Sequence, residues 1–403
     1  MTKTFALITE RKNPPDRRVV FSPDLCKQFL KAYPKADLIV EESDNRVFSN
    51  QEYIEKGIKV MKNIEHADIF LGVKEVPIEE LIPNKTYLFF SHTIKMQPYN
   101  RKLLQAILKN NIELIDHETL VKSNGVRLVG FGRYAGLVGA YNGIRMLGLK
   151  EQLFDIPKVE TLKDLSEVKQ VLDCVKLPAI KIVLTGTGKV GRGAKEVLDH
   201  MGIKKVNIHE FLSNDFREPV YCNLSAIDYV KRIDGTKKET QDFYRNPEAY
   251  KSDFQRFAIV ADMFVAGHFY SEGSPKIISK TDLEHPQFKI KYIADISCDI
   301  NGPIATTIRP STIENPFYGY NTKTHSEVNY INPDAIAIMA VDNLPCELPR
   351  DASEGFGQMF LQKIIPSFFN GDKKEILKNA RITTKKGRLT EKFEYLNSFV
   401  KEN

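Results

Sequence analysis

The feature that most constrains the fold is a regular alternation of short apolar runs with amphipathic stretches over the first 130 residues. The intervening segments, such as Pro23–Tyr33 and Asn100–Asn110, have the spacing of helices. Continuous apolar runs joined by helices are typical of a parallel sheet that is covered on both faces. The predicted strands are residues 5–8, 36–40, 69–73, 87–90 and 112–115.

A second series of the same kind begins with the apolar run at 179–185. Before it, Tyr134–Gly148 carries small residues at helical spacing, which predicts a helix that another element can approach closely and that bridges two domains. Residues 211–257 are charged and rich in Tyr and Phe, so we expect an excursion from the sheet. Further strands are predicted at 206–209, 258–264 and 291–295, and an apolar run follows at 333–341.

The pattern predicts an α/β protein with two Rossmann-like parallel-sheet domains flanking a cleft. A helix predicted from about residue 351 to 369 is expected to return to the first domain, which makes that domain discontinuous. We expect a substrate-binding and catalytic domain over 1–132 plus 350–403. The dinucleotide-binding domain is expected over 133–349, with the excursion at 211–257 inside it.

Charge and cysteine content exclude several classes of protein. The 58 basic and 52 acidic residues are interleaved, as at Lys231–Glu239, so the net charge of +6 forms no stripe for nucleic acid and suits small anionic ligands instead. The sequence contains no run of about 18 apolar residues, so no membrane span is predicted. The N-terminus lacks the features of a signal peptide. Five scattered cysteines without a CxxC pair indicate a reduced, cytoplasmic protein without a metal site, and the sequence leaves the oligomeric state open.

A GxGxxG motif directly follows the strand predicted at 179–185 and precedes a helical pattern. Gly186 permits a tight turn, Gly188 lets the backbone approach a pyrophosphate, and Gly191 lets the helix pack on the strand. The helix N-terminus then offers N–H groups to the phosphates. A glycine-rich turn without a ligand is the alternative. The residues predicted to contact the dinucleotide are Gly186, Thr187, Gly188, Lys189, Val190 and Gly191.

The choice between NAD and NADP depends on what meets the adenosine ribose. Glu210 lies about 20 residues beyond the motif, at the end of the next predicted strand, where a carboxylate would bind a ribose 2′-hydroxyl. This position favours NAD. Lys204, Lys205 and Arg192 are close enough in sequence to leave a 2′-phosphate possible.

Polar residues also follow successive strands of the first domain, where the ends of parallel strands would bring them together. A cluster of cations, a histidine and carboxylates suits an anionic substrate that needs proton transfer. Each residue alone is more commonly a solvated surface charge or a structural histidine, and their repetition on successive strands carries the argument. They are Arg17, Arg18, Lys74, Glu75, His92, Lys95 and Glu118.

Several stretches together resemble a known family. Phe89–Lys95 (FFSHTIK) and Asp342–Pro349 (DNLPCELP) are the most specific. With them, the sequence resembles the lysine-forming saccharopine dehydrogenases and lysine-ketoglutarate reductases of the alanine dehydrogenase/transhydrogenase superfamily, and the closest likeness is to the reductase half of aminoadipic semialdehyde synthase. The other matching stretches are residues 16–23, 71–77, 131–136, 184–190, 295–299 and 312–317.

The resemblance implies an NAD(P)-dependent reductive condensation of lysine with 2-oxoglutarate to saccharopine, and its reverse. It places the acid–base pair on Lys74 and His92, with Glu75 and Glu118 setting their charge and pKa. Two groups of different pKa are useful because amine attack needs a base and carbinolamine dehydration needs an acid.

The resemblance also implies how the substrate is held. Arg18, with Arg17 as its alternative, would bind substrate carboxylates together with Arg127 and Lys95, since arginine recognises carboxylates with two parallel hydrogen bonds. Asp299 would lie near the nicotinamide and the amine. Two alternatives stay open: an enzyme with other amino-acid substrates on the same scaffold, and a dinucleotide-binding regulatory protein without catalysis.

Overall fold

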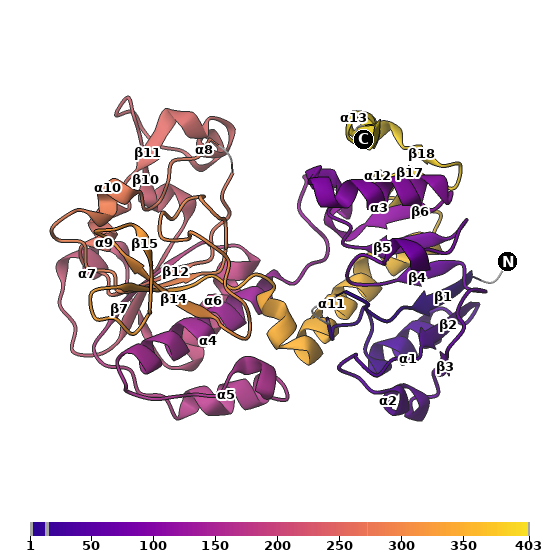
Figure 1. The fold of residues 1–403 in the computed structure, drawn as a ribbon, viewed down its shortest axis with the longest axis horizontal. Helices are drawn as coiled ribbons and strands as arrows, with labels where there is room; N and C mark the ends of the chain where they lie inside the picture. Colours follow the sequence, from indigo (N-terminus) through magenta and orange to yellow (C-terminus); the bar gives the residue numbers. More distant parts are fainter. Residues whose placement is uncertain (1–2, 13–15, 272, 402–403) are drawn as a thin grey trace. The chain divides into compact units, whose positions relative to one another are not determined.

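A computed structural model of the chain describes residues 3–12, 16–271 and 273–401. The chain divides into two compact units, which are described separately (Figure 1). Unit 1 comprises the residues up to Phe131 together with those from Pro349 onward, and unit 2 comprises Gly132–Leu348. The first unit is therefore discontinuous in sequence.

Unit 1 is built on a six-stranded sheet in the order β3-β2-β1-β4-β5-β6, with every neighbouring pair parallel. All five predicted strands of this unit are confirmed. The sixth, β3, was not predicted because its short edge run carries exposed Lys59 and Met61 and no buried residue. The strands are β1 Lys3–Leu7, β2 Ala36–Glu41, β3 Lys59–Met61, β4 Ile69–Leu71, β5 Thr86–Phe89 and β6 Glu113–Asp116.

Helices cover both faces of this sheet. Phe21 and Phe29 join Phe356 and Phe360 of helix α11 in one core, and Leu104 joins Phe399 in the other. Ser22 caps α1 by accepting the N–H of Leu25. The helices are α1 Pro23–Ala32, α2 Asn50–Glu55, α3 Pro98–Lys109, α11 Pro349–Lys363, α12 Ile376–Ala380 and α13 Asn397–Lys401, and a small hairpin pairs β17 Thr383–Thr384 with β18 Arg388–Leu389.

Unit 2 is built on an eight-stranded sheet in the order β15-β14-β16-β13-β12-β7-β9-β8. This sheet is mixed rather than parallel throughout, because β14 pairs antiparallel with both of its neighbours, β16 and the edge strand β15. The strands are β7 Lys181–Thr185, β8 Lys204–Lys205, β9 Val220–Leu224, β12 Met263–Ala266, β13 Tyr292–Asp295, β14 Phe317–Asn321, β15 Ser326–Val328 and β16 Ile336–Met339.

Two predictions for unit 2 need correction. The strand predicted at 206–209 is wrong, because Asn207 accepts the N–H of Glu210 and caps a helix, α7, at that point. The excursion predicted at 211–257 includes β9, which lies inside the sheet. What leaves the sheet is residues 226–258, which contain a separate hairpin of β10 Val230–Arg232 and β11 Tyr250–Ser252, with α8 Thr240–Arg245 between its strands (Figure 1).

The helix predicted at 134–148 is α4, and it packs against α6 through glycines on both sides. A Cβ atom at Gly136 would overlap the carbonyl oxygen of Val190, and one at Gly193 would overlap that of Arg133. The helices of unit 2 are α4 Gly132–Lys150, α5 Leu165–Asp173, α6 Lys189–His200, α7 Ile208–Ser213, α8, α9 Gln255–Ala258 and α10 Lys280–Leu283. Within the described residues, every helix is too short or too polar to span a bilayer.

Candidate active site and dinucleotide site

Five of the predicted catalytic and substrate-binding residues gather at the carboxyl edge of the unit 1 sheet. Lys74 and Glu75 follow β4, His92 and Lys95 follow β5, and Glu118 follows β6. These strands are neighbours, so their ends meet at one edge. The charges of the other four residues all act on the imidazole of His92, which places the five side chains in one electrostatic cluster.

His92 occupies an unusual backbone position in this cluster. Its φ is 55°, in the left-handed region that few non-glycine residues adopt. Its carbonyl oxygen accepts the N–H of Lys95 at 3.0 Å and the side-chain amide of Asn100 at 3.2 Å. Burial lowers the pKa of His92 below 6.5; Glu118 opposes this shift, and Lys95 and Lys74 reinforce it. The imidazole is therefore neutral at pH 7 and able to accept a proton.

Glu118 is a buried carboxylate at the centre of the cationic groups. One oxygen accepts a hydrogen bond from Arg127 Nη2 at 2.8 Å and lies 3.8 Å from Lys95 Nζ. Its other oxygen is buried, and no partner for it lies among the described residues. Arg127 and Lys95 are half exposed, so their cationic ends also face solvent.

Asp116 was missed by the sequence analysis, although it precedes Glu118 by only two residues. Its carboxylate accepts the N–H of Ser91 at 2.9 Å and that of Glu118 at 2.6 Å, and it also bonds the Ser91 hydroxyl. Burial raises the pKa of Asp116 to about 6. One side chain thus fixes both the loop that carries His92 and the backbone of Glu118.

Two more acidic residues define the other side of the cluster, and both were missed. The carboxylate of Glu10 accepts the N–H groups of Val73 at 2.6 Å and Lys74 at 2.8 Å, joining the ends of β1 and β4. Burial and the charge of Asp16 raise the pKa of Glu10 to about 8. In turn, Asp16 forms a buried ion pair with Arg18, in which Nη2 lies 2.6 Å from the carboxylate.

The predicted substrate arginines differ in their surroundings. Arg18 donates from Nε and Nη2 to Asp16, and its guanidinium lies 4.2 Å from the ring centre of Phe131. Its neighbour Arg17 is exposed. Burial would raise the pKa of Asp16, but the ion pair with Arg18 outweighs that effect and lowers the pKa to about 2. Arg18 is thus held firmly in place, while Arg127 is the more accessible of the two.

Glu75 is tied to a residue on the loop after β1. Its carboxylate lies 2.6 Å from Lys12 Nζ. Burial would raise the pKa of Glu75, but the hydrogen bond from Lys12 outweighs that effect and lowers it. Glu75 therefore remains a carboxylate beside His92, whose positive form it favours.

In unit 2, the glycine motif forms the turn from β7 into α6. Gly186 has a φ of 97°, and a Cβ there would overlap the carbonyl group of Gly267. A Cβ at Gly191 would overlap the carbonyl oxygen of Gly186. Gly188 is the N-terminal cap of α6, and a Cβ on it would meet nothing within 4 Å. Two glycines therefore shape the turn and the third leaves its outer side open for a ligand.

A pocket of about 300 Å³ lies against this turn. Its wall includes the N-terminal end of α6, and the first N–H groups of a helix favour an anion. The open Gly188 and the α6 terminus together fit the pyrophosphate of a dinucleotide. The remaining lining residues, which the sequence analysis missed, are Ala226, Tyr229, Tyr244, Gly267, His268 and Phe269.

Glu210 does not lie at a strand end. Its carboxylate accepts the N–H of Asn207 at 3.0 Å, completing the capping box of α7. β7 lies between β12 and β9, and β8 pairs only with β9 at the edge. Counting along the sequence pointed to Glu210, whereas the sheet order makes the end of β9 the position next to the glycine turn.

A groove of about 560 Å³ lies beside the ends of β8 and β9. Lys205 and His209 line it, and its Asn223 donates to the carbonyl oxygen of Gly186 at 3.0 Å. These two basic residues are candidates to meet a 2′-phosphate. Asp299 is exposed beyond β13, two strands from β7 in the same sheet. Among the described residues, no three His, Cys, Asp or Glu side chains form a metal site.

Comparison with known proteins places these features in a family context. Residues 6–138 match the family described as alanine dehydrogenase/PNT, N-terminal domain. The chain is 27% identical to a saccharopine dehydrogenase (NAD⁺, L-lysine-forming) of Candida glabrata, covering 90% of this chain and 91% of that protein.

The chain is also 29% identical to the mitochondrial α-aminoadipic semialdehyde synthase of Rattus norvegicus, over 97% of this chain and 47% of that protein. It therefore spans about half the length of that relative. A solved structure of L-alanine dehydrogenase shares the fold with a TM-score of 0.66 at 16% identity, covering 98% of this chain and 99% of that one. The resemblance drawn from the sequence motifs and the α/β fold are confirmed.

Proposed function

We propose, from the premise that the chain is a relative of the lysine-forming saccharopine dehydrogenases, that it is an NAD(P)-dependent oxidoreductase which condenses L-lysine with 2-oxoglutarate to saccharopine and catalyses the reverse reaction. The observation that carries the proposal is the cluster of His92, Lys74 and Glu118 at neighbouring strand ends. Similarity over nine tenths of both chains to a saccharopine dehydrogenase supports it. The cluster belongs to unit 1 and the glycine turn to unit 2.

His92 acts as the base in the condensation. The ε-amine of lysine must lose a proton before it attacks the ketone carbon of 2-oxoglutarate. The imidazole is neutral at pH 7 because burial and the nearby cations lower its pKa. Glu118 and Glu75 favour the imidazolium once the proton has been transferred, so they stabilise the product of this step.

Lys74 acts as the acid that completes the dehydration. The carbinolamine loses its hydroxyl group as water, and an ammonium group can donate the proton required. The N–H of Lys74 is fixed by Glu10, which positions the base of this side chain. The charge of Lys74 acts on both His92 and Asp16, which supports this assignment.

The cationic side chains bind the carboxylates. Saccharopine carries three of them, and we assign Arg127 and Lys95 as ligands because both are half exposed beside the cluster. Arg18 contributes a fixed positive charge, with Arg17 as the exposed alternative. Glu118 holds Arg127 in place until a substrate carboxylate arrives.

The glycine turn holds the cofactor. Gly186–Gly191 and the N-terminus of α6 would bind its pyrophosphate. A bound reduced nicotinamide dinucleotide would supply the hydride that adds to the carbon of the protonated imine and gives the secondary amine. We assign Asp299 to the neighbourhood of the nicotinamide, since it follows a strand of the same sheet edge.

Substrate specificity tests the proposal. The purified protein is assayed with lysine, 2-oxoglutarate and NADH or NADPH, and saccharopine is identified by mass spectrometry. We expect saccharopine to form only when all components are present. Faster turnover with pyruvate and ammonia would identify a different amino-acid dehydrogenase, and dinucleotide binding without any turnover would identify a regulatory protein.

A further inference from the structure

The segment that leaves the sheet, residues 226–258, lines the pocket at the glycine turn. It contributes Tyr229 and Tyr244, and the loop after β12 contributes Phe269. The exposed fractions of Tyr244 and Phe269 are 60% and 82%, although both border a pocket. Large aromatic rings that remain open to solvent beside a pocket are suited to stacking on a planar ligand.

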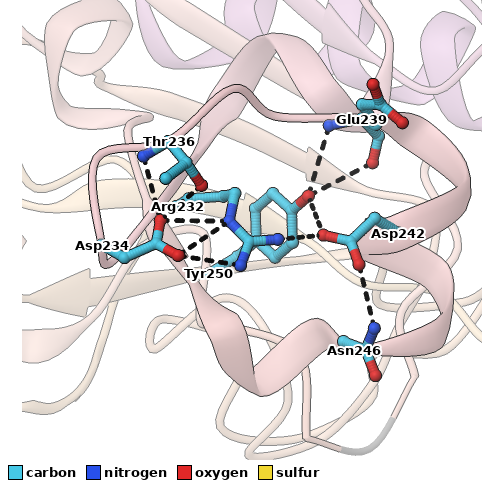
Figure 2. Close-up of polar contacts among 7 residues, drawn as sticks. All are labelled: Arg232, Asp234, Thr236, Glu239, Asp242, Asn246 and Tyr250. Carbon is cyan, nitrogen blue, oxygen red and sulfur yellow. Dashed lines mark hydrogen bonds and ion pairs between the residues drawn. The ribbon is translucent and has the colours of Figure 1, made fainter.

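The helix α8, which carries Tyr244, is held by a polar network centred on Arg232 (Figure 2). The guanidinium of Arg232 bonds Asp242 of α8 and also Asp234 of the loop, where Nη2 donates at 2.9 Å. The hydroxyl of Tyr250 on β11 donates to the same Asp242 at 2.7 Å. The network therefore ties α8 to both strands of the hairpin.

Apolar packing under α8 reinforces this arrangement. Phe243 is buried, and its ring centre lies 5.2 Å from that of Tyr250. Consecutive helical residues point about 100° apart, so burying Phe243 leaves the next ring, Tyr244, off the packed face. The two rings are 5.7 Å apart between centres. A short helix of six residues is thus fixed so that one ring anchors it and the next borders the pocket.

The sheet order indicates which half of a dinucleotide this pocket receives. In dinucleotide-binding sheets, the adenosine half lies over the strand next to the glycine-loop strand, where a ribose ligand is placed. On the side of β7 that the chain reaches after α6, that neighbour is β9. The pocket extends from the residues that follow β9, across the glycine turn, to those that follow β12 on the other side of β7. We propose that Tyr244 and Phe269 stack on the adenine ring of the bound dinucleotide, and that the Arg232 network positions Tyr244 for this contact.

The inference deepens the proposed function, since it rests on dinucleotide binding at the glycine turn. The test is isothermal titration calorimetry with ADP and with NADH or NADPH on the full chain. We expect Tyr244→Ala and Phe269→Ala each to weaken ADP and dinucleotide binding by about 10-fold, as loss of one base–aromatic stack does. Tyr244→Phe keeps the ring and should bind as the wild type does.

Tyr395→Ala is the matched control, because Tyr395 is 51% exposed and belongs to unit 1. It should leave both affinities unchanged. Unchanged ADP affinity in both pocket variants would overturn the stacking, and weakened dinucleotide binding with normal ADP binding would place the rings on the nicotinamide instead. A wild-type protein that binds neither ligand would overturn the proposed function as well.

The positioning role of Arg232 is tested by a double-mutant cycle. Arg232 does not line the pocket, so Arg232→Ala should weaken ADP binding by about threefold to 10-fold only through Tyr244. Combined with Tyr244→Ala, it should cause no further loss, and Arg232→Lys should restore part of the affinity by pairing with Asp242. Equal losses from Arg232→Ala with and without Tyr244 would show that the network acts independently of the ring.

Discussion

The carboxyl edges of the two sheets share parallel neighbouring strands but carry different side chains. At the unit 1 edge, the ends of β4, β5 and β6 present His92 and four ionisable residues that act on it. At the unit 2 edge, the ends of β7 and β12 present glycines, and the pocket beside them is bordered by exposed aromatic rings.

The difference shows how one backbone arrangement serves two kinds of binding. Because glycines leave the unit 2 edge without side chains, the N–H groups of a helix end are exposed there. Such groups can bind an anion although they carry no formal charge. Adding charged side chains at the unit 1 edge creates groups that exchange protons, and buried acids such as Asp116 and Glu10 are needed to hold them. A site for proton transfer thus needs buried polar side chains that hold its charged groups in place, whereas a site for phosphate needs backbone N–H groups that no side chain covers.

The largest effect is expected at the carboxyl edge of the unit 1 sheet, which carries the charged residues. His92→Ala and Lys74→Met should each lower kcat by about 10²- to 10⁴-fold, because each removes a group to which the proposed mechanism assigns proton transfer. Dinucleotide affinity by calorimetry should stay unchanged, since the glycine turn belongs to the other unit. His66→Ala and Lys102→Met, at exposed positions of unit 1, are the controls. A parallel loss of dinucleotide affinity would contradict the assignment of proton transfer to the unit 1 edge and dinucleotide binding to the unit 2 edge.

The second largest effect is expected at the carboxyl edge of the unit 2 sheet, which carries the glycine turn. Gly188→Val should weaken dinucleotide binding by at least about 100-fold, because the side chain would occupy the place of the pyrophosphate. The fold should survive, since φ at Gly188 is −77° and a Cβ meets nothing within 4 Å. Gly191→Val is the contrasting variant, and its overlap with Gly186 should lower the melting temperature sharply. Tight dinucleotide binding by a folded Gly188→Val variant would show that the glycine turn is not part of the dinucleotide site.

The buried ion pair of unit 1 predicts a pH-dependent contribution to stability. Asp16→Asn leaves Arg18 buried without its counter-charge and should lower the free energy of unfolding at pH 7 by about 3 kcal/mol. The pKa of Asp16 is lowered from 3.8 to about 2 in the folded state. Its charged form therefore contributes about 2 kcal/mol above pH 4, and this contribution is lost as pH falls toward 2.

Urea unfolding at several pH values measures this effect. The difference between wild type and Asp16→Asn should narrow as pH falls from 5 toward 2. The exposed pair of Asp37 and Lys59, 3.2 Å apart, provides a control in Asp37→Asn, which should change stability by less than about 1 kcal/mol. A constant difference across this pH range would contradict the assigned role of Asp16.

The smallest expected effect concerns Glu210. Glu210→Ala removes the capping box of α7 and should cost about 0.5–1 kcal/mol of stability in urea unfolding. The ratio of NADH to NADPH affinity should not change, because the carboxylate is bonded to Asn207. A change in that ratio of more than about 10-fold, or 1.4 kcal/mol, would restore Glu210 as the ribose ligand.

Local periodicity was sufficient to predict five of the six strands of unit 1 and the strand–turn–helix at the glycine motif. It could not give sheet order, which depends on contacts between distant segments. For this reason β9 was assigned to the excursion, and Glu210 was placed beside a turn whose true neighbour is the end of β9. The two-residue strand β8, Lys204–Lys205, is exposed and gives no apolar signal.

Part of the candidate site was predictable for a similar reason. Side chains that follow parallel strands share one edge of the sheet, and β4, β5 and β6 are neighbours, so Lys74, His92 and Glu118 could be grouped from sequence. The acids that support them could not, because Glu10 and Asp116 act through backbone N–H groups brought near only by folding. Tyr244 and Phe269 lie 25 residues apart in sequence, and only the pocket connects them.

The contact between α4 and α6 restricts how this protein can be re-engineered. Gly136 and Gly193 bring two backbones together with no side chain between them, so no neighbouring residue can adjust to a larger one. A library meant to alter coenzyme preference should keep both glycines constant. Variation is better directed at the solvent-open rim, at Ala226, Tyr244 and Phe269, where new atoms find room without moving the helix.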